Sequence, residues 1–139
     1  GEMHGLIAAT EDQTTADGVE WGCINTEITG AEGTAIGAGA QNTLDILAGC
    51  SEDGIPAKLA SDYEVTVDGV TYDDWFLPSK DELNLLYLNN EAVGGFANNY
   101  YWSSTERGND FAWFQLFSNG YQANGSKYYA YRVRAVRTF

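Results

Sequence analysis

Short apolar runs alternate with polar, glycine-rich stretches along the first part of the chain. The run at residues 4–10 is bounded by glycine and then by polar residues, which predicts a β-strand. Residues 11–39 contain six glycines and predict a loop, anchored to the core by Trp21 and Cys23. His4, the single histidine, stands at the start of the first strand. We interpret it as a surface residue rather than a ligand, because no partner lies near it in sequence.

Helical spacing and a tight-turn signal follow. An apolar stripe over residues 41–49 predicts a helix, with Gly49 expected as its C-terminal cap. A second, short helix is predicted over residues 55–61. The alternating runs at residues 65–67 and 70–72 flank an Asp-Gly dipeptide, which favours a β-hairpin because both central residues of a type I′ turn need positive φ.

A helix over residues 80–90 has the clearest start signal in the chain. Ser79 can cap the first amides of the helix while Glu82, three residues on, reaches back to the amide of Ser79. Leu83 and Leu86 then share one face. Four acids in this region resemble catalytic carboxylates, but no paired acid, base or histidine accompanies them. We therefore expect solvated or capping roles for Asp73, Asp74, Asp81 and Glu82.

The C-terminal third predicts strands at residues 111–117, 121–123 and 131–139, with a tight turn at 118–120. Alternation along the first strand sends Trp113, Gln115 and Phe117 to one face and Ala112, Phe114 and Leu116 to the other. Both faces are therefore partly apolar. Two alternatives stay open: other chain segments cover both faces, or Phe114 and Leu116 form an exposed apolar patch.

Composition and charge narrow the class of protein. The chain has 139 residues, 44% of them hydrophobic, and a net charge of −13, which indicates one folded domain and argues against nucleic-acid binding. No apolar run is long enough for a membrane helix, and residues 1–10 lack the pattern of a signal peptide, so membrane insertion is not expected. Residues 1–105 carry a net charge of −16 and residues 106–139 a net charge of +3. The C-terminal third is thus a distinct, aromatic and weakly basic region.

The two cysteines, Cys23 and Cys50, fit no metal or redox motif. They form either a single disulfide, which we favour, or two buried free thiols. The chain also contains no phosphate-binding glycine loop, no nucleophile elbow and no His-Glu-x-x-His motif. We therefore expect no enzymatic activity, no cofactor and no metal.

Five motifs distributed over the whole chain resemble a C-type lectin-like family. The resemblance is to the formylglycine-generating-enzyme-like branch and, within it, to the variable proteins of diversity-generating retroelements. It rests on His4-Gly-Leu-Ile-Ala-Ala, Trp21-Gly-Cys, Asp73-Asp-Trp-Phe-Leu-Pro-Ser-Lys-Asp-Glu-Leu, Tyr101-Trp-Ser-Ser-Thr-Glu and Arg132-Val-Arg-Ala-Val-Arg. It implies an α+β, C-type lectin-like fold with two main helices and small antiparallel sheets. Residues 1–139 would form a single domain, with the variable region at residues 101–139.

In such proteins a reverse transcriptase copies a template with errors at adenines, so that asparagine codons become any codon ending in C or T. Such codons cannot specify Lys, Gln, Glu, Met or Trp. Trp113, Gln115, Gln122 and Lys127 are thus interpreted as scaffold. The candidate variable positions, which we expect to bind the ligand, are Arg107, Gly108, Asn109, Asp110, Phe111, Phe114, Leu116, Tyr121, Ala123, Asn124, Gly125, Ser126, Tyr128, Tyr129, Ala130 and Tyr131.

The sequence departs from the resemblance in three respects. Members usually carry a further glycine-rich strand upstream of the His-Gly-Leu segment, whereas this sequence opens at Gly1-Glu-Met, so we expect it to be a fragment of a longer domain. Formylglycine-generating enzymes use cysteines in their C-terminal half, whereas none follows Cys50 here, so enzymatic activity does not carry over. The Glu-Pro-Asn and Gln-Pro-Asp loops of calcium-dependent sugar binding are also absent, because the two prolines, Pro56 and Pro78, stand in other contexts.

The leading hypothesis is a non-catalytic receptor-recognition protein on a virion or cell surface. Its variable face would bind a macromolecular ligand, for which we favour a protein, through large rigid tyrosines. The alternative is an invariant structural adhesin or tail-fibre domain. From strand alternation we expect Phe114, Leu116, Tyr121, Tyr128, Tyr129 and Tyr131 to form one accessible patch with Arg107 and Asp110 near its rim.

Overall fold

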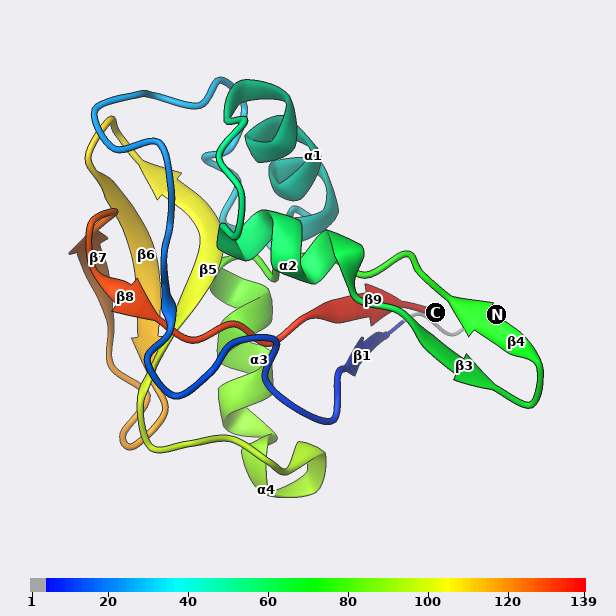
Figure 1. The fold of residues 1–139 in the computed structure, drawn as a ribbon. Coiled ribbons are helices and arrows are strands. Elements are labelled where there is room, and N and C mark those ends of the chain that lie inside the picture. Colours follow the sequence, from blue (N-terminus) through cyan, green and yellow to red (C-terminus); the bar gives the residue numbers. More distant parts are fainter. Residues whose placement is uncertain (1–4) are drawn as a thin grey trace.

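The two ends of the described chain lie side by side in the fold. The computed structural model describes residues 5–139, which form four helices and four small antiparallel sheets, an α+β fold of the C-type lectin-like kind (Figure 1). Strand β1 (Leu6–Ala8) pairs with β9 (Val136–Thr138), with Leu6 opposite Thr138. His4, for which a surface position is expected, lies outside the described residues.

The strand expected over residues 131–139 is divided in two. Strand β8 (Ala130–Tyr131) pairs with β2 (Val19–Glu20), whereas β9 pairs with β1. Between them the chain crosses beside Trp102, whose amide donates to the carbonyl of Arg132 at 3.0 Å. The single-strand prediction was wrong because this crossing segment changes its partners part-way along.

Helices α1 (Gly39–Gly49) and α2 (Pro56–Asp62) agree with the helices predicted over residues 41–49 and 55–61. Gly49 is not the cap that the sequence suggested, because the helix includes it and ends at Cys50, whose amide donates to the carbonyl of Ile46. Gly49 instead allows close packing: a Cβ there would lie 3.2 Å from Ile28. A disulfide joins Cys50 to Cys23 in the preceding loop.

Helix α3 (Lys80–Leu88) begins at the predicted capping box. The Ser79 hydroxyl accepts from the amide of Glu82, and the Glu82 carboxylate accepts from the amide of Ser79 at 2.8 Å. Glu82 is fully buried and also accepts from the amides of Gly37 and Gly39. The helix stops at Asn89, before a short separate helix α4 (Asn90–Val93), rather than continuing to residue 90.

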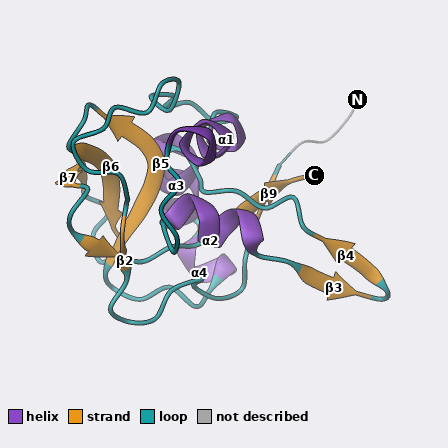
Figure 2. Cartoon of the chain, turned by 45° about the horizontal axis from the view of Figure 1, so that its top comes forward, coloured by secondary structure: helices purple, strands orange, loops and turns teal. Residues whose placement is uncertain are grey.

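The predicted hairpin is present as β3 (Val65–Val67) and β4 (Val70–Tyr72). Its turn residues Asp68 and Gly69 have φ values of 51° and 81°. Figure 2 shows the hairpin extending away from the helices, beside the end of the chain.

The largest sheet orders β5 (Tyr100–Arg107), β6 (Phe111–Leu116) and β7 (Gln122–Ser126), with a register shift between Trp102 and Glu106. Helix α3 packs against one face, where its Leu83 and Leu86 lie in one cluster with Phe117. Trp21 and Trp102 lie at the centre of a second cluster, which includes Phe114. A third cluster surrounds Trp75 and Val133. Within residues 5–139, no helix has the length and apolar character that crossing a bilayer requires.

Candidate ligand-binding face

The candidate variable positions lie at the end of β5, on β6, β7 and β8, and in the turns that join these strands, at the end of the molecule shown on the left of Figure 1. Most are accessible to solvent. The exposed ones are Arg107, Gly108, Asn109, Phe111, Tyr121, Asn124, Tyr128, Tyr129 and Ala130. The half-buried ones are Asp110, Leu116, Ala123, Ser126 and Tyr131.

Phe114 and Gly125 are buried, contrary to their expected place on an accessible face. Phe114 does point away from Trp113, as alternation requires, but Tyr100 and Tyr131 cover it, with ring centroids 5.3 and 5.1 Å from its own. Gly125 lies against the rings of Phe114 and Tyr131, and a Cβ there would stand 2.9 Å from the Phe114 ring. The reason is that β8 pairs with β2 and carries Tyr131 over the sheet, which a pattern of alternation does not reveal.

The remaining candidate positions divide between two sides of the β6–β7 pair. Leu116, Tyr121 and Ala123 share the side of Phe114, whereas Phe111 and Asn124 fall on the side of Trp113 by the observed register. The candidate positions therefore lie on both sides of the β6–β7 pair and extend into the 107–110 turn. They cover a wider area than the single patch that alternation suggested.

An aromatic stack centred on Tyr131 lies beside the exposed Tyr129. Tyr131 stacks on Tyr100 at 5.0 Å and contacts Trp102 at 4.6 Å and Tyr129 at 5.9 Å. Burial, with Tyr100 and Tyr129 nearby, raises the pKa of Tyr131 to about 12. Its hydroxyl, like that of any tyrosine, is protonated at neutral pH and can donate a hydrogen bond. We name Tyr121, Tyr128 and Tyr129, which are 60%, 68% and 53% exposed, the tyrosine face.

The four residues interpreted as scaffold each contact other parts of the chain. Gln115 is fully buried and donates to Asn84 and to the carbonyl of Gly120. Gln122 donates to the carbonyl of Lys80 at 2.9 Å. Trp113 is half-buried and is therefore less enclosed than a core residue. The Lys80 ammonium lies over its ring, 4.5 Å from the centroid.

Lys127, the fourth, forms a fully buried ion pair with Glu106, with an Nζ–Oε2 distance of 2.7 Å. The Lys127 ammonium also donates to the carbonyl of Thr26, and Glu106 accepts from the amide of Ile28. Burial raises the pKa of the Glu106 carboxyl, while Lys127 and the Ile28 amide oppose that rise. The pair fixes the turn that leads directly into Tyr128.

A carboxylate cluster lies beside this pair. Oxygens of Glu27, Glu32 and Glu106 lie within 4.8 Å of one another. Lys127 already neutralises Glu106, and the other two acids are exposed. We therefore assign no metal to the cluster.

The family model described as the Lcl C-terminal domain matches residues 11–137. The chain belongs to the Lcl C-terminal domain family. This is a variable-protein-like C-type lectin domain, of a kind associated with diversity-generating retroelements and with ligand binding. Among proteins with curated functions, none matches the chain.

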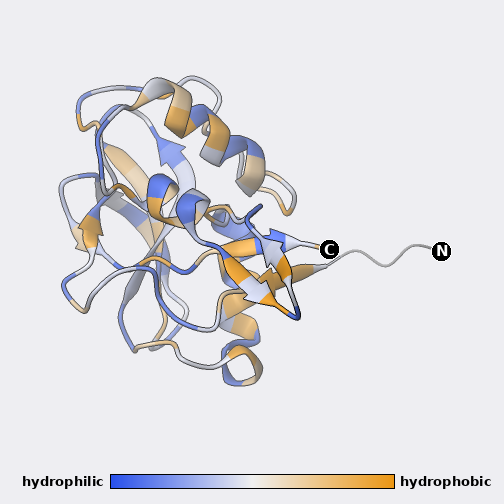
Figure 3. Ribbon diagram, turned by 45° about the vertical axis from the view of Figure 1, so that its right-hand side comes forward, coloured by the Kyte–Doolittle hydropathy of each residue, from blue (hydrophilic) through white to orange (hydrophobic). Residues whose placement is uncertain are grey.

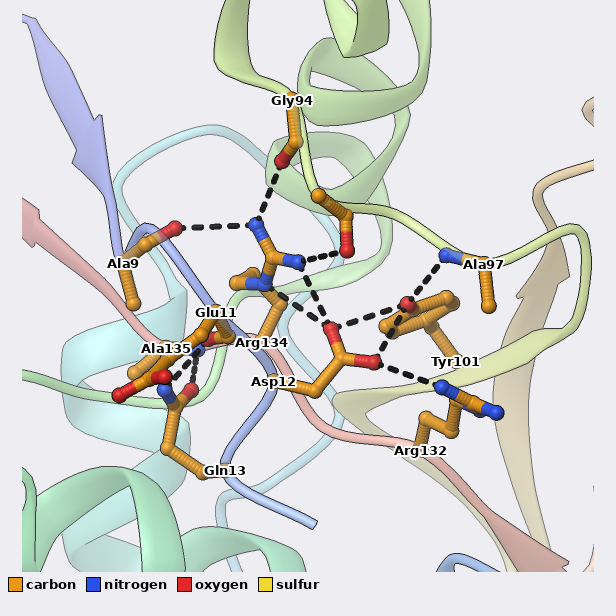
Figure 4. Close-up of polar contacts among 11 residues, drawn as sticks. Ala9, Glu11, Asp12, Gln13, Gly94, Ala97, Tyr101, Arg132, Arg134 and Ala135 are labelled. Atoms are coloured by element: carbon orange, nitrogen blue, oxygen red, sulfur yellow. Dashed lines mark hydrogen bonds and ion pairs between the residues drawn. The ribbon is translucent and has the colours of Figure 1, made fainter. Parts of the chain in front are cut away.

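Asp12, near the start of the region that matches the Lcl C-terminal domain, lies in a polar centre that the sequence did not predict (Figure 4). Asp12 accepts hydrogen bonds from Arg132, Arg134 and the hydroxyl of Tyr101, at 2.8 to 3.1 Å. Burial raises the pKa of Tyr101 to about 12. The spaced arginines of the C-terminal motif were the available signal, but nothing in the sequence shows that Asp12 is their partner.

Arg134 completes this centre with its remaining donors. It donates to the carbonyls of Ala9, Gly94 and Gly95 and is fully buried. The centre holds the first loop, the segment before β5 and the crossing between β8 and β9 together. It thereby sets the position of Tyr131 in the Lcl C-terminal domain.

Proposed function

We propose that this domain is a non-catalytic receptor-recognition module whose C-terminal face is diversified by a retroelement. In this proposal it is a variable protein of the formylglycine-generating-enzyme-like branch, displayed on a virion or cell surface, and it binds a protein ligand. One observation carries the proposal. The residues within the variable region that the codon rule forbids make interior contacts, whereas most of the candidate variable positions face solvent.

Gln115 and Lys127 illustrate the rule. Both belong to residue types that codons ending in C or T cannot produce, both are fully buried, and both hold neighbouring segments by hydrogen bonds. Tyr128 follows Lys127 directly and is 68% exposed. Variation at Tyr128 would change the surface while the ion pair beside it keeps the backbone in place.

The residue types suit protein recognition. Tyrosine presents a large, rigid, amphipathic ring with few rotatable bonds, so ordering it on binding costs little entropy. The aromatic stack centred on Tyr131 restricts Tyr129 further. Small residues between them, such as Ala130 and Ser126, leave room for a partner to approach.

A matched pair of displayed libraries tests the binding role. The first varies the exposed candidate positions with codons ending in C or T and keeps Gln115 and Lys127 constant. The second varies the same number of exposed positions on α1, α2 and α3 with the same codons. Selection against lysozyme, as an arbitrary protein target, should enrich folded binders from the first library alone. Equal enrichment from both would remove the special role of this face.

The genome tests the retroelement. We expect a neighbouring reverse-transcriptase gene and an imperfect repeat of the codons for residues 101–139 that differs only at template adenines. Absence of both, with an identical sequence at these positions among isolates, would favour the invariant adhesin instead.

A further inference from the structure

An apolar groove lies at the end of the molecule opposite the tyrosine face. In Figure 1, β7 and β8 stand at one end and the β3–β4 hairpin at the other. The groove has a volume of about 800 Å³. Its apolar lining includes Ile7, Val65, Val67, Tyr72, Trp75 and Phe139. It is therefore separate from the face assigned to ligand binding.

The hairpin presents an uncovered apolar side. Val65 pairs with Tyr72 and Val67 with Val70, so these four side chains share one face. Val67 and Val70 are 51% and 52% exposed, and Figure 3 shows hydrophobic positions along the hairpin. An isolated two-stranded hairpin is marginally stable in water, so a partner packed on this face would stabilise it.

Strand β1, which lines the groove, has a free backbone edge within the described residues. Gly5 and Phe139 exchange both amide hydrogen bonds, and the amide of Ala9 donates to the carbonyl of Ala135. Antiparallel pairing alternates, so the peptide groups of Leu6 and Ala8 point away from β9. Residues 5–139 supply no strand on that side. Such an edge is a template for strand addition.

The acidic residues around the groove favour a basic partner. The exposed acids Glu11 and Glu64 line the groove, and Asp68 stands at the hairpin tip, whereas Arg137, the only basic residue in the lining, is paired with Asp74 at 2.6 Å. A second copy of the same face would bring these carboxylates together, which is unfavourable. A strand with basic residues beside its apolar core would be attracted.

We propose that the groove is a docking site for an extended apolar strand of another protein, flanked by lysine or arginine, which adds to the free edge of β1. Main-chain hydrogen bonds to β1 would supply affinity, and alternate apolar side chains would enter the groove. The domain would then be attached at one end and present the tyrosine face at the other.

A labelled peptide tests the groove directly. The probe alternates valine with threonine and carries a lysine at each end, and its binding is followed by fluorescence anisotropy at low salt. We expect a glutamate-flanked version to bind at least about tenfold more weakly, with the difference reduced at high salt. A version with proline at alternate positions, which lacks the amide donors, should not bind.

Two matched variants locate the site. Val67 lines the groove and its cross-strand partner Val70 does not, although their exposures are nearly equal. Val67→Lys should weaken binding of the lysine-flanked peptide about tenfold or more, while Val70→Lys should change it less than about twofold. Circular dichroism checks that both variants remain folded.

Several results would overturn the proposal. These are no binding of the lysine-flanked peptide, equal binding of the proline version, and equal effects of Val67→Lys and Val70→Lys. Sedimentation provides a further check. A dimer that Val67→Lys alone dissociates would assign the groove to a second copy instead.

Discussion

Phe114 provides the sharpest test of how far the candidate variable face reaches into the core. Its ring is 8% exposed and lies beneath Tyr100 and Tyr131. Replacing a buried phenylalanine by alanine costs about 3–5 kcal/mol. We expect the lower end, about 3 kcal/mol, for Phe114→Ala, because the tyrosines above can move partly into the space left behind.

Phe111→Ala is the matched control, since it makes the same substitution in the same strand at a site that is 48% exposed. Because about half of its ring is already in water, its cost should be about 1 kcal/mol. The expected difference of about 2 kcal/mol corresponds to about 6–10 °C in melting temperature for a domain of this length. Thermal unfolding followed by circular dichroism measures both. Equal shifts for the two variants would refute the assignment of Phe114 to the core.

Three further outcomes are expected. Lys127→Met should lower the free energy of unfolding, measured in urea, by about 3–5 kcal/mol, because it leaves the buried carboxylate of Glu106 without its cation. Lys58→Met, at an exposed pair, should lower it by less than about 0.5 kcal/mol. Similar losses for the two variants would contradict the role of the buried pair. Replacing both cysteines by serine should lower the free energy of unfolding by about 3–4 kcal/mol, given the sequence separation of 27 residues. No loss would show that the disulfide does little to restrict the unfolded chain. The pKa of Tyr101 is raised to about 12, above its unfolded value near 10, so its contribution to stability is retained below pH 10 and lost as pH rises towards 12. Ultraviolet titration should therefore show a late tyrosinate step from Tyr101 and Tyr131 together, whose amplitude Tyr101→Phe reduces by about half. A step near pH 10 that Tyr101→Phe removes would contradict the burial of Tyr101.

Elements with local signals could be predicted from the sequence. The capping box at Ser79 and Glu82 and the Asp68-Gly69 turn depend on residues within three positions of each other, so their chemistry is visible in the sequence. The longest strand, β5, was not predicted. Its middle residues, Ser103 to Thr105, are polar but fully buried, and they are satisfied by partners far away in sequence, such as the carbonyl of Gly33.

The candidate site likewise combines features that neighbouring residues determine with features that distant residues determine. Alternation along β6 placed Phe114 on the correct side of the sheet, but exposure depends on what covers that side. The cover is Tyr131, positioned by pairing of β8 with β2 and by the Asp12 centre. Both contacts join residues more than a hundred positions apart, so no local pattern contains them.

The burial of Phe114 and Gly125 limits what diversification can achieve at this face. Codons ending in C or T allow charged and polar residues at both positions, such as aspartate and asparagine. A carboxylate beneath Tyr131 would lose hydration without gaining a partner, and any side chain at position 125 would meet the Phe114 ring. Folding would therefore restrict these two positions to a small set of residues, even if the codons vary freely. The useful diversity would then come from the exposed positions around them, chiefly the tyrosine face and the 107–110 turn.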